Sequence, residues 1–594
     1  MASASTAVPN KAYDAPGSVT GSSDIIHGVQ ENNYHDDDDA ERQSDTSSTH
    51  KQGGVEAVEA LTTVWSDKTM LTLFILLWLV AFIDDLLQAV QGSVSPYVTS
   101  TFNEHGLLGV TGIVATILGG VCNLAIAKVI DIWGRCEGFI VMIFLVIIGM
   151  VMKAACINIE MYAAANTIYW VGHIGVGYVI TILFADMTTL RNRLILFGLK
   201  GTPIICSVFA GPKIADLFVH HSNFRWAFGA FCIIYVFFAI PVIVVFILSK
   251  RKGVREGKFP KKIKTRTYWE STKFYFVEFD VVGMACTTFG FCLLLLSFSL
   301  APKAPNGWKT GYIIAMIVLG VVFIAAFVVW EKYFAKVQYF PFKYLKDRTI
   351  LASSLLYGFM FMSIFVWDTY YSSYLQVVHD LSITNAGYVL NTFSLTSAII
   401  GPLVGVAIRY IGTFKYFSIG TTPFAILGTA LLLKFRTPGS HVGYLVMCQL
   451  FNGVYSGVWS LTAQLAIMAV VGHQELAVAI ALYGLFGSIG ASIGNALAAA
   501  LWNNILPVEL YKNLPDDAKN LTQTIFGNIN VQLSYPMGSP IREATIQAYG
   551  HVQRLMVITG VCFIPVCVAC LFAWKNINVI KVDAARKKSG SNVF

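Results

Sequence analysis

The chain has 594 residues, of which 55% are hydrophobic and only 13% are charged, and its formal net charge is +8 at pH 7. Soluble domains typically carry about 25% charged residues, so this composition excludes a water-soluble globular protein. The eleven cysteines lie in apolar stretches, which excludes a secreted disulfide scaffold and favours membrane-buried thiols.

The first segment, residues 1–64, is rich in Ser, Thr, Asp and Gly and includes four consecutive aspartates at 36–39. Such a segment buries too little apolar surface to order itself, so we expect a disordered tail. No apolar stretch lies near residue 1, so we expect no cleavable signal peptide.

Fourteen apolar stretches follow, each near the roughly 20 residues that a spanning helix needs. We therefore expect an all-α membrane protein. The expected helices are 70–92, 108–130, 138–158, 161–184, 194–217, 226–249, 280–301, 311–333, 351–375, 386–409, 416–434, 442–470, 477–502 and 552–574.

Lysine and arginine are concentrated in alternate connections, most strongly in a basic loop at 250–275. Because cytoplasmic connections carry an excess of these residues, the bias predicts that both termini are cytoplasmic. The basic loop is expected to lie on anionic lipid headgroups. Orientation thus explains the positive charge, and no nucleic-acid partner is expected.

The chain contains one Asn-x-Ser/Thr triplet, which begins at Asn520 and lies in the longest outward connection, 503–551. Acceptor asparagines face the lumen during synthesis. Asn520 is therefore a predicted glycosylation site, in agreement with the predicted orientation.

A short motif occurs twice, as AKVIDIWGR at 127–135 and as GVAIRYIGTFK at 405–415. Each copy has a small residue, a charge four positions on and a glycine three further. The motif resembles the major facilitator signature G-x-x-x-D-[RK]-x-G-[RK], found between the second and third helices. The first copy keeps Asp131, Gly134 and Arg135, whereas the second has Arg409 at the aspartate position and keeps Gly412.

This resemblance implies a major facilitator fold with fourteen transmembrane helices arranged 6+2+6. The expected division is a cytoplasmic tail at 1–64, a six-helix bundle at 65–249, the basic loop at 250–275, two central helices at 276–347, a second six-helix bundle at 348–575 with the outer loop 503–551, and a cytoplasmic tail at 576–594.

The motif has a local physical reading. Asp131 lies at a helix end, where it can pair with Arg135 or cap a neighbouring helix, and Gly134 permits a tight turn. The residues that follow the fourth helix are expected beside it. The complete predicted gating set is Asp131, Gly134, Arg135, Asp186, Arg191, Arg193, Arg409 and Gly412.

Four further segments favour one fourteen-helix family. They read FIDDLLQ at 82–88, ADMTTLRNR at 185–193, WDTYYSSYLQVV at 367–378 and AYGHVQR at 548–554. Together they resemble the fungal siderophore–iron transporters over about residues 65–575. This resemblance implies proton-coupled import of ferric hydroxamate siderophores by alternating access.

Several alternatives remain open. Drug–proton antiporters carry the motif G-x-x-x-G-P-x-x-G-G, of which SVFAGPKIAD at 207–216 keeps only the central Gly-Pro. Glutathione–proton exchangers are similar relatives, and a membrane sensor is a third possibility. We find no catalytic constellation, so an enzyme is not expected.

Asp84 and Asp85 interrupt the first apolar stretch. A carboxylate inside a spanning helix is expensive and normally faces a cavity or a partner, and burial disfavours its charged form. Adjacent side chains point about 100° apart, so we favour Asp84, which matches the family's aspartate, as the proton site. Asp85 and His173 complete the candidate proton-coupling set; the alternative is a structural salt bridge or packing.

A ferric trihydroxamate is electrically neutral, so its pocket should be aromatic and hydrogen-bonding. Asn452, Tyr455 and Trp459 share one helix face, and a second aromatic cluster ends the ninth helix. The alternative is an interfacial aromatic belt. The candidate substrate-binding residues are Trp367, Tyr370, Tyr371, Tyr374, Asn452, Tyr455, Trp459, Tyr549 and Arg554.

The sequence contains no G-x-x-x-x-G-K-[ST] motif and no metal-binding motif, so neither ATP-driven pumping nor a resident cofactor or metal is expected. Iron would arrive already chelated. The expected partners are the ferric siderophore, protons and the lipid bilayer. We expect a monomer in the plasma membrane, with an endosomal or vesicular membrane as the alternative.

Overall fold

The computed structural model describes residues 65–188, 190–258, 267–301, 304–337, 340, 342–472 and 475–588, without the side chains of 131, 190–194 and 586–588. The predicted tail at 1–64 lies outside these ranges. Within them the chain forms helices and one isolated bridge between Thr413 and Asn578. The cysteines are all free.

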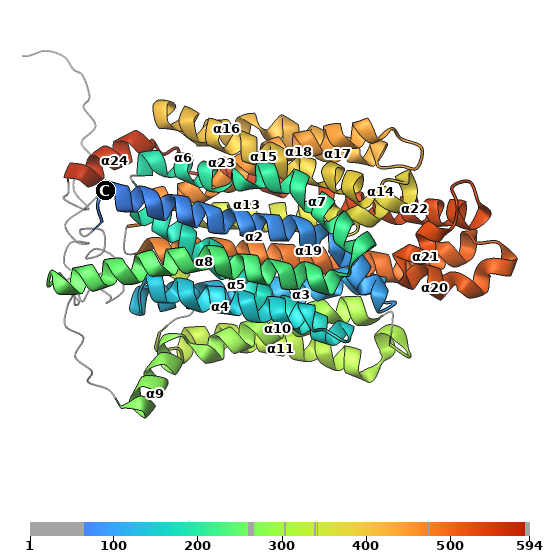
Figure 1. Cartoon of the computed structure of the whole chain (residues 1–594), viewed down its shortest axis with the longest axis horizontal. Coiled ribbons are helices and arrows are strands. Elements are labelled where there is room, and N and C mark those ends of the chain that lie inside the picture. Colours follow the sequence, from blue (N-terminus) through green and yellow to red (C-terminus); the bar gives the residue numbers. More distant parts are fainter. Residues whose placement is uncertain are drawn as a thin grey trace, which may run out of the picture. The chain divides into compact units, whose positions relative to one another are not determined.

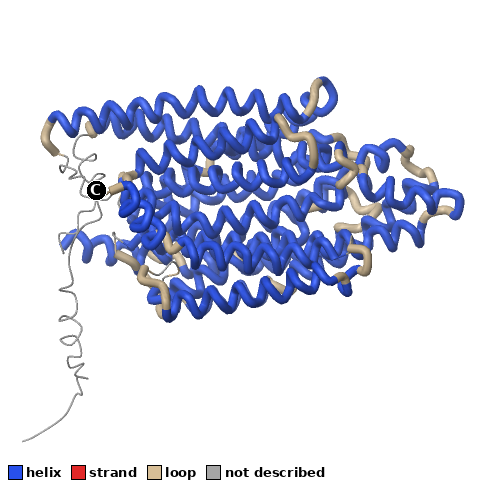
Figure 2. Tube along the Cα trace, turned by 90° about the horizontal axis from the view of Figure 1, so that it is seen from below, coloured by secondary structure: helices blue, strands red, loops and turns tan. Residues whose placement is uncertain are grey.

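The long helices run along one common direction (Figures 1 and 2). Fourteen candidate spans in the described ranges are long and apolar enough to cross a membrane, so the prediction of an all-α membrane protein is confirmed. The first group of helices is α2 (Asp67–Thr101), α3 (Leu108–Ile132), α4 (Arg135–Ala154), α5 (Ile159–Asp186), α6 (Leu190–Lys200), α7 (Pro203–His221) and α8 (Phe224–Arg255).

Four helices follow between the two groups: α9 (Tyr268–Glu278), α10 (Val281–Leu300), α11 (Gly311–Tyr333) and α12 (Phe342–Leu345). The remaining helices are α13 (Arg348–Asp368), α14 (Tyr371–His379), α15 (Ile383–Ile411), α16 (Lys415–Gly420), α17 (Thr422–Phe435), α18 (Val442–Val470), α19 (Leu476–Asn513), α20 (Thr522–Gly527), α21 (Ile529–Ser534), α22 (Pro540–Val561), α23 (Ile564–Ala573) and α24 (Val579–Lys588). Short 3₁₀ turns are η1 (His105–Leu107), η3 (Gly307–Lys309) and η5 (Asp516–Leu521).

The two ends of this bundle differ in the short helices that lie there. We call the end with η5, α20 and α21 the loop end, and the opposite end, with α9 and α24, the tail end (Figure 1). We call α2–α8 the N-terminal group and α13–α23 the C-terminal group. The groups meet through α3 against α19 and through α6 and α7 against α15.

Helices α10 and α11 pack on each other, and α10 also packs on α3 and α19. The central pair therefore lies beside the junction of the two groups. These contacts do not by themselves fix the 6+2+6 division, which stays a prediction.

Four predicted helices are interrupted in the structure. Prolines lie at the first or second position of α7, α17 and α23, and a proline without a backbone N–H cannot continue a preceding helix. The break between α13 and α14 falls at Thr369 and Tyr370 without a proline.

The long connection predicted at 503–551 is mostly helical, which corrects that expectation. Helix α19 continues to Asn513, and α22 begins at Pro540 instead of residue 552. Ser539 caps α22 by accepting a hydrogen bond from the Arg542 N–H. The Arg542 side chain is buried and donates to backbone oxygens of Val377 and Gln532, so this polar first turn packs on protein.

Candidate functional site

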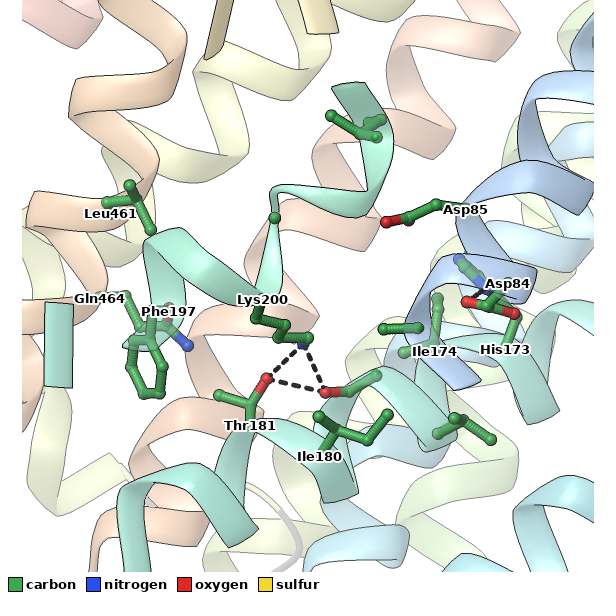
Figure 3. Close-up of a pocket in the computed structure, with 15 residues that line it drawn as sticks. Asp84, Asp85, His173, Ile174, Ile180, Thr181, Phe197, Lys200, Leu461 and Gln464 are labelled. Atoms are coloured by element: carbon green, nitrogen blue, oxygen red, sulfur yellow. Dashed lines mark hydrogen bonds and ion pairs between the residues drawn. The ribbon is translucent and has the colours of Figure 1, made fainter. Parts of the chain in front are cut away.

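A cavity of about 370 Å³ lies between the two groups of helices, toward the tail end. Helices α2, α5, α6 and α18 all contribute to its wall. We call it the tail-end cavity (Figure 3); its lining includes Asp84, Asp85, His173, Thr181, Lys200, Leu461 and Gln464.

Asp84 is buried and paired. His173 Nδ1 lies 2.7 Å from Asp84 Oδ2, and the Tyr235 hydroxyl donates to Asp84 Oδ1 at 3.3 Å. The His173 contact is close without being an aligned hydrogen bond, and it is an ion pair when the imidazole is protonated. The structure thus brings together two of the three predicted proton-coupling residues.

Asp85, the third, lines the same cavity. It points into the cavity on the side of Lys200 (Figure 3). The Lys200 ammonium donates to the Gly177 carbonyl at 2.8 Å and to Thr181 Oγ1 at 2.7 Å. One cavity therefore holds two carboxylates, an imidazole and an ammonium inside spanning helices.

Sequence reasoning did not assign two lysines that lie inside spanning helices. Lys200 lies inside the predicted helix 194–217, and Lys153 lies near the end of the predicted helix 138–158. A lysine inside an apolar span is rare and usually functional, so the sequence itself could have identified both as candidates. Lys153 is fully buried. Its ammonium lies 3.7 Å from the centre of the Tyr169 ring and donates to Gln91 Oε1 at 2.7 Å.

A second cavity, of about 200 Å³, lies nearer the loop end. We call it the loop-end cavity. Its wall is mainly amide, hydroxyl and aromatic and comes from both groups, with Gln91, Asn166 and Trp170 on one side and Asp368 and Asn495 on the other.

The two cavities are separated by one turn of α5. Trp170 lines the loop-end cavity and His173 lines the tail-end cavity. Their ring centres are 5.1 Å apart. This turn of α5 therefore contributes to the walls of both cavities.

Contacts between the groups close the loop end. The Tyr370 hydroxyl donates to the Gly106 carbonyl at 3.0 Å and accepts from the Gly109 N–H at 3.3 Å. Its ring stacks on Trp502 at 4.0 Å between centres. The buried His105 lies 3.2 Å from the Ser373 hydroxyl.

A contact also crosses between the groups at the tail end, where the Tyr178 hydroxyl donates to the Ala477 carbonyl at 2.6 Å. Contacts between the two groups therefore lie at both ends of the bundle.

The predicted substrate-binding residues line neither cavity in this structure. Trp459 Nε1 donates to the Ser418 carbonyl, and Asn452 lies against Gly428, so this face points into the C-terminal group. The other buried members are Trp367, Tyr370, Tyr371, Tyr374, Tyr455 and Tyr549. Arg554 is exposed, and the substrate role of the set stays a prediction.

The predicted gating motif is described in part, because the side chains of Asp131, Arg191 and Arg193 lie outside the described set. Arg135 is buried and its Nε lies 3.3 Å from Asp186 Oδ2. The pair ties the start of α4 to the end of α5.

Both motif glycines adopt positive φ, 121° at Gly134 and 79° at Gly412. Gly134 is the N-cap of α4, and Gly412 is the C-cap of α15. The tight turn was predicted at Gly134, and the second copy has a positive-φ glycine at the corresponding place.

Two surface predictions can be located. Asn520 is exposed on η5 at the loop end. The basic loop is described except for 259–266, and it ends in α9, where Tyr268 and Trp269 are 95% and 77% exposed. Exposed aromatic rings beside basic residues suit a membrane interface, and lipid contact stays a prediction.

Known proteins place the chain in a family. Residues 77–371 match the model of the Major Facilitator Superfamily. The protein "MFS siderochrome iron transporter 1" of Ajellomyces capsulatus is 49% identical over 94% of this chain and 96% of its own length. The chain belongs to the siderophore iron transporter family of the major facilitator superfamily.

Another relative in this family, "Siderophore iron transporter mirB" of Emericella nidulans, is 39% identical over 90% of this chain and 88% of its own length. Family membership confirms the resemblance seen in the sequence and identifies a transporter rather than an enzyme.

Solved structures support the fold alone. A bacterial homologue of the human lysosomal transporter Spinster matches with a TM-score of 0.54 at 12% identity, covering 88% of this chain and 99% of its own. The peptide transporter POT in complex with sulfate matches with a TM-score of 0.50 at 16% identity, covering 81% and 95%. The major facilitator fold is therefore confirmed.

Proposed function

We propose that this protein is a proton-coupled importer of ferric hydroxamate siderophores that works by alternating access in the plasma membrane. Siderophore-iron transport is supported by the relatives just described, which match nearly the full chain. Proton coupling is supported by the tail-end cavity.

The observation that carries the coupling is the placement of Asp84. Its carboxylate lies in a spanning helix, contacts His173 on α5 and accepts from Tyr235 on α8. Protonation of Asp84 would remove the charge that attracts His173 and so loosen α2 from α5. A proton bound from one side and released to the other would thereby bias which junction is closed.

The cargo chemistry suits the loop-end cavity. A neutral iron chelate with carbonyl and amide groups requires hydrogen-bonding and aromatic partners rather than strong charge. Gln91, Asn166 and Asn495 supply amides and Trp170 supplies an aromatic face. The present volume fits only part of such a chelate, so the loop-end junction at Tyr370 must open to load it.

Uptake of radioactive iron tests this proposal in yeast that lacks its own siderophore transporters. Cells expressing the chain receive a panel of ferric siderophores, with and without a protonophore. We expect saturable uptake of at least one ferric hydroxamate and its loss with the protonophore. Surface-localised protein that imports no siderophore, or uptake that ignores the protonophore, would reject the proposal and favour drug–proton antiport or glutathione–proton exchange.

A further inference from the structure

Asp368 is an acidic residue that the coupling scheme above does not use. It is the last residue of α13 and lines the loop-end cavity. Among the described residues no hydrogen bond or ion pair engages its carboxylate. A carboxylate at membrane depth without a partner is expensive and points to function.

The position of Asp368 on its helix increases that cost. The carboxyl end of a helix carries partial negative charge from the unpaired carbonyls of its last turn. An ionised carboxylate there is repelled unless it is neutralised. Asp368 is therefore placed to bind a proton or to find a cation.

A buried cation, Arg436, contacts the residue that precedes Asp368. Arg436 follows α17 and is only 1% exposed. Its Nη1 donates to the carbonyl of Trp367 at 2.6 Å, and the guanidinium stacks on the Tyr371 ring at 3.6 Å from the ring centre. Its Nε and Nη2 have no hydrogen-bond partner.

Arg436 thus bonds the residue before Asp368 without pairing with its carboxylate. Buried guanidinium N–H groups left without acceptors are costly. A second state in which Asp368 turns from the cavity to Arg436 would satisfy these donors. It would also neutralise the carboxylate.

We propose, building on the coupling proposed above, that Asp368 is a second proton-binding site, loaded from the loop-end cavity. With the proton bound, the neutral acid faces the cavity, as in this structure. On release, the proton leaves toward the tail-end cavity, where Asp84 accepts it, and the carboxylate ion pairs with Arg436. One proton is bound and one is released, so the step is balanced.

Few other titratable groups surround Asp368, so a change in the pH dependence of transport can be assigned to it. The remaining cavity lining from α2, α3, α15 and α19 is not titratable. The charged or titratable neighbours are Arg436 at the end of α17, Tyr371 on α14, Tyr162 on α5 across the cavity and Lys153 on α4 behind Gln91.

Purified full-length protein in lipid vesicles tests this site through two readouts: accumulation of a ferric siderophore driven by an imposed pH gradient, and exchange of labelled for unlabelled siderophore without a gradient. We expect Asp368→Asn to lose both gradient-driven accumulation and the pH dependence of uptake, and to lose accumulation by a much larger factor than exchange. Asp368→Glu, which keeps the acid, should restore accumulation in part. The matched control Asp516→Asn, at a carboxylate that is 95% exposed, should behave as wild type.

Wild-type accumulation and an unchanged pH profile in Asp368→Asn would overturn the inference. Loss of exchange in that variant, unrescued by Asp368→Glu, would also overturn it, since the residue would then serve cargo or folding. A wild-type protein that ignores the gradient would instead reject the proposed coupling itself, so the two failures are distinguishable.

Discussion

The two groups of helices share a glycine turn and differ in the ionisable side chains that they carry. In each, a positive-φ glycine forms the turn after the helix that follows its first span, at Gly134 and at Gly412. The N-terminal group, however, places four ionisable side chains in the tail-end cavity and buries a fifth elsewhere. The four are Asp84, Asp85, His173 and Lys200, and the fifth is Lys153.

Toward the loop-end cavity the C-terminal group presents mainly uncharged side chains, with Asp368 as the ionisable residue of its lining and Arg436 as a neighbouring cation. The two groups therefore share the turn of the repeated motif and differ in the charge that they place at the cavities. We infer that most of the proton-binding side chains belong to the N-terminal group and that the C-terminal group contributes one, Asp368.

The largest predicted effect comes from removing the charge at the centre of the N-terminal group. Asp84→Asn should lower proton-driven accumulation of ferric siderophore in yeast by about tenfold or more, a loss of ~1.4 kcal/mol or more, because the amide cannot bind and release the proton. Surface expression, followed by a fluorescent tag, should be unchanged. Asp516→Asn is the matched control, and normal accumulation in Asp84→Asn would remove this residue from coupling.

The next prediction separates function from stability. Lys153→Met replaces a fully buried ammonium by an apolar side chain of similar length. The change removes the cost of burying a charge, although Gln91 Oε1 loses this donor. We expect a thermal unfolding midpoint in detergent at or above that of wild type, together with slower transport. A lower midpoint with full transport would show that the lysine serves the fold only.

A smaller effect should distinguish the two copies of the repeated motif. Gly134 has φ 121° and ψ 159°, a region essentially confined to glycine, where another residue costs about 1–3 kcal/mol. Gly412 has φ 79° and ψ −7°, nearer the left-handed region, where the penalty is about 1–2 kcal/mol. Gly134→Ala should therefore lower the unfolding midpoint more than Gly412→Ala. Equal shifts would mean that the two turns are equivalent.

The smallest effect is on the loop end alone. Asn520→Gln should abolish an endoglycosidase-sensitive shift in electrophoretic mobility and leave transport unchanged, because Asn520 is exposed on η5. Such a shift in the wild type would place the loop end on the luminal or outer side. An unshifted wild-type band would withdraw this support for the orientation.

The spans could be predicted from the sequence because each is a long apolar run. The breaks before α7, α17 and α23 were also predictable, because a proline lies at the start of each of these helices. The helical connection at 503–551 escaped prediction because its polar turns are stabilised by packing, as at Arg542, which hydropathy does not detect.

The candidate site was predictable in its residue types and less so in its geometry. Asp84 and His173 were separate candidates, and only the fold shows their 2.7 Å contact. Helical periodicity correctly grouped Asn452, Tyr455 and Trp459 on one face. It could not tell whether that face meets the cavity or, as here, the interior of the C-terminal group.

The most direct test of the account measures proton entry itself. Purified wild-type protein is placed in lipid vesicles that contain a pH-sensitive dye. Buffer without siderophore is added first as a control, and a ferric hydroxamate siderophore is added second. Proton-coupled import predicts internal acidification only when the ferric siderophore is added, and none with Asp84→Asn. Siderophore entry without acidification in the wild type would contradict it.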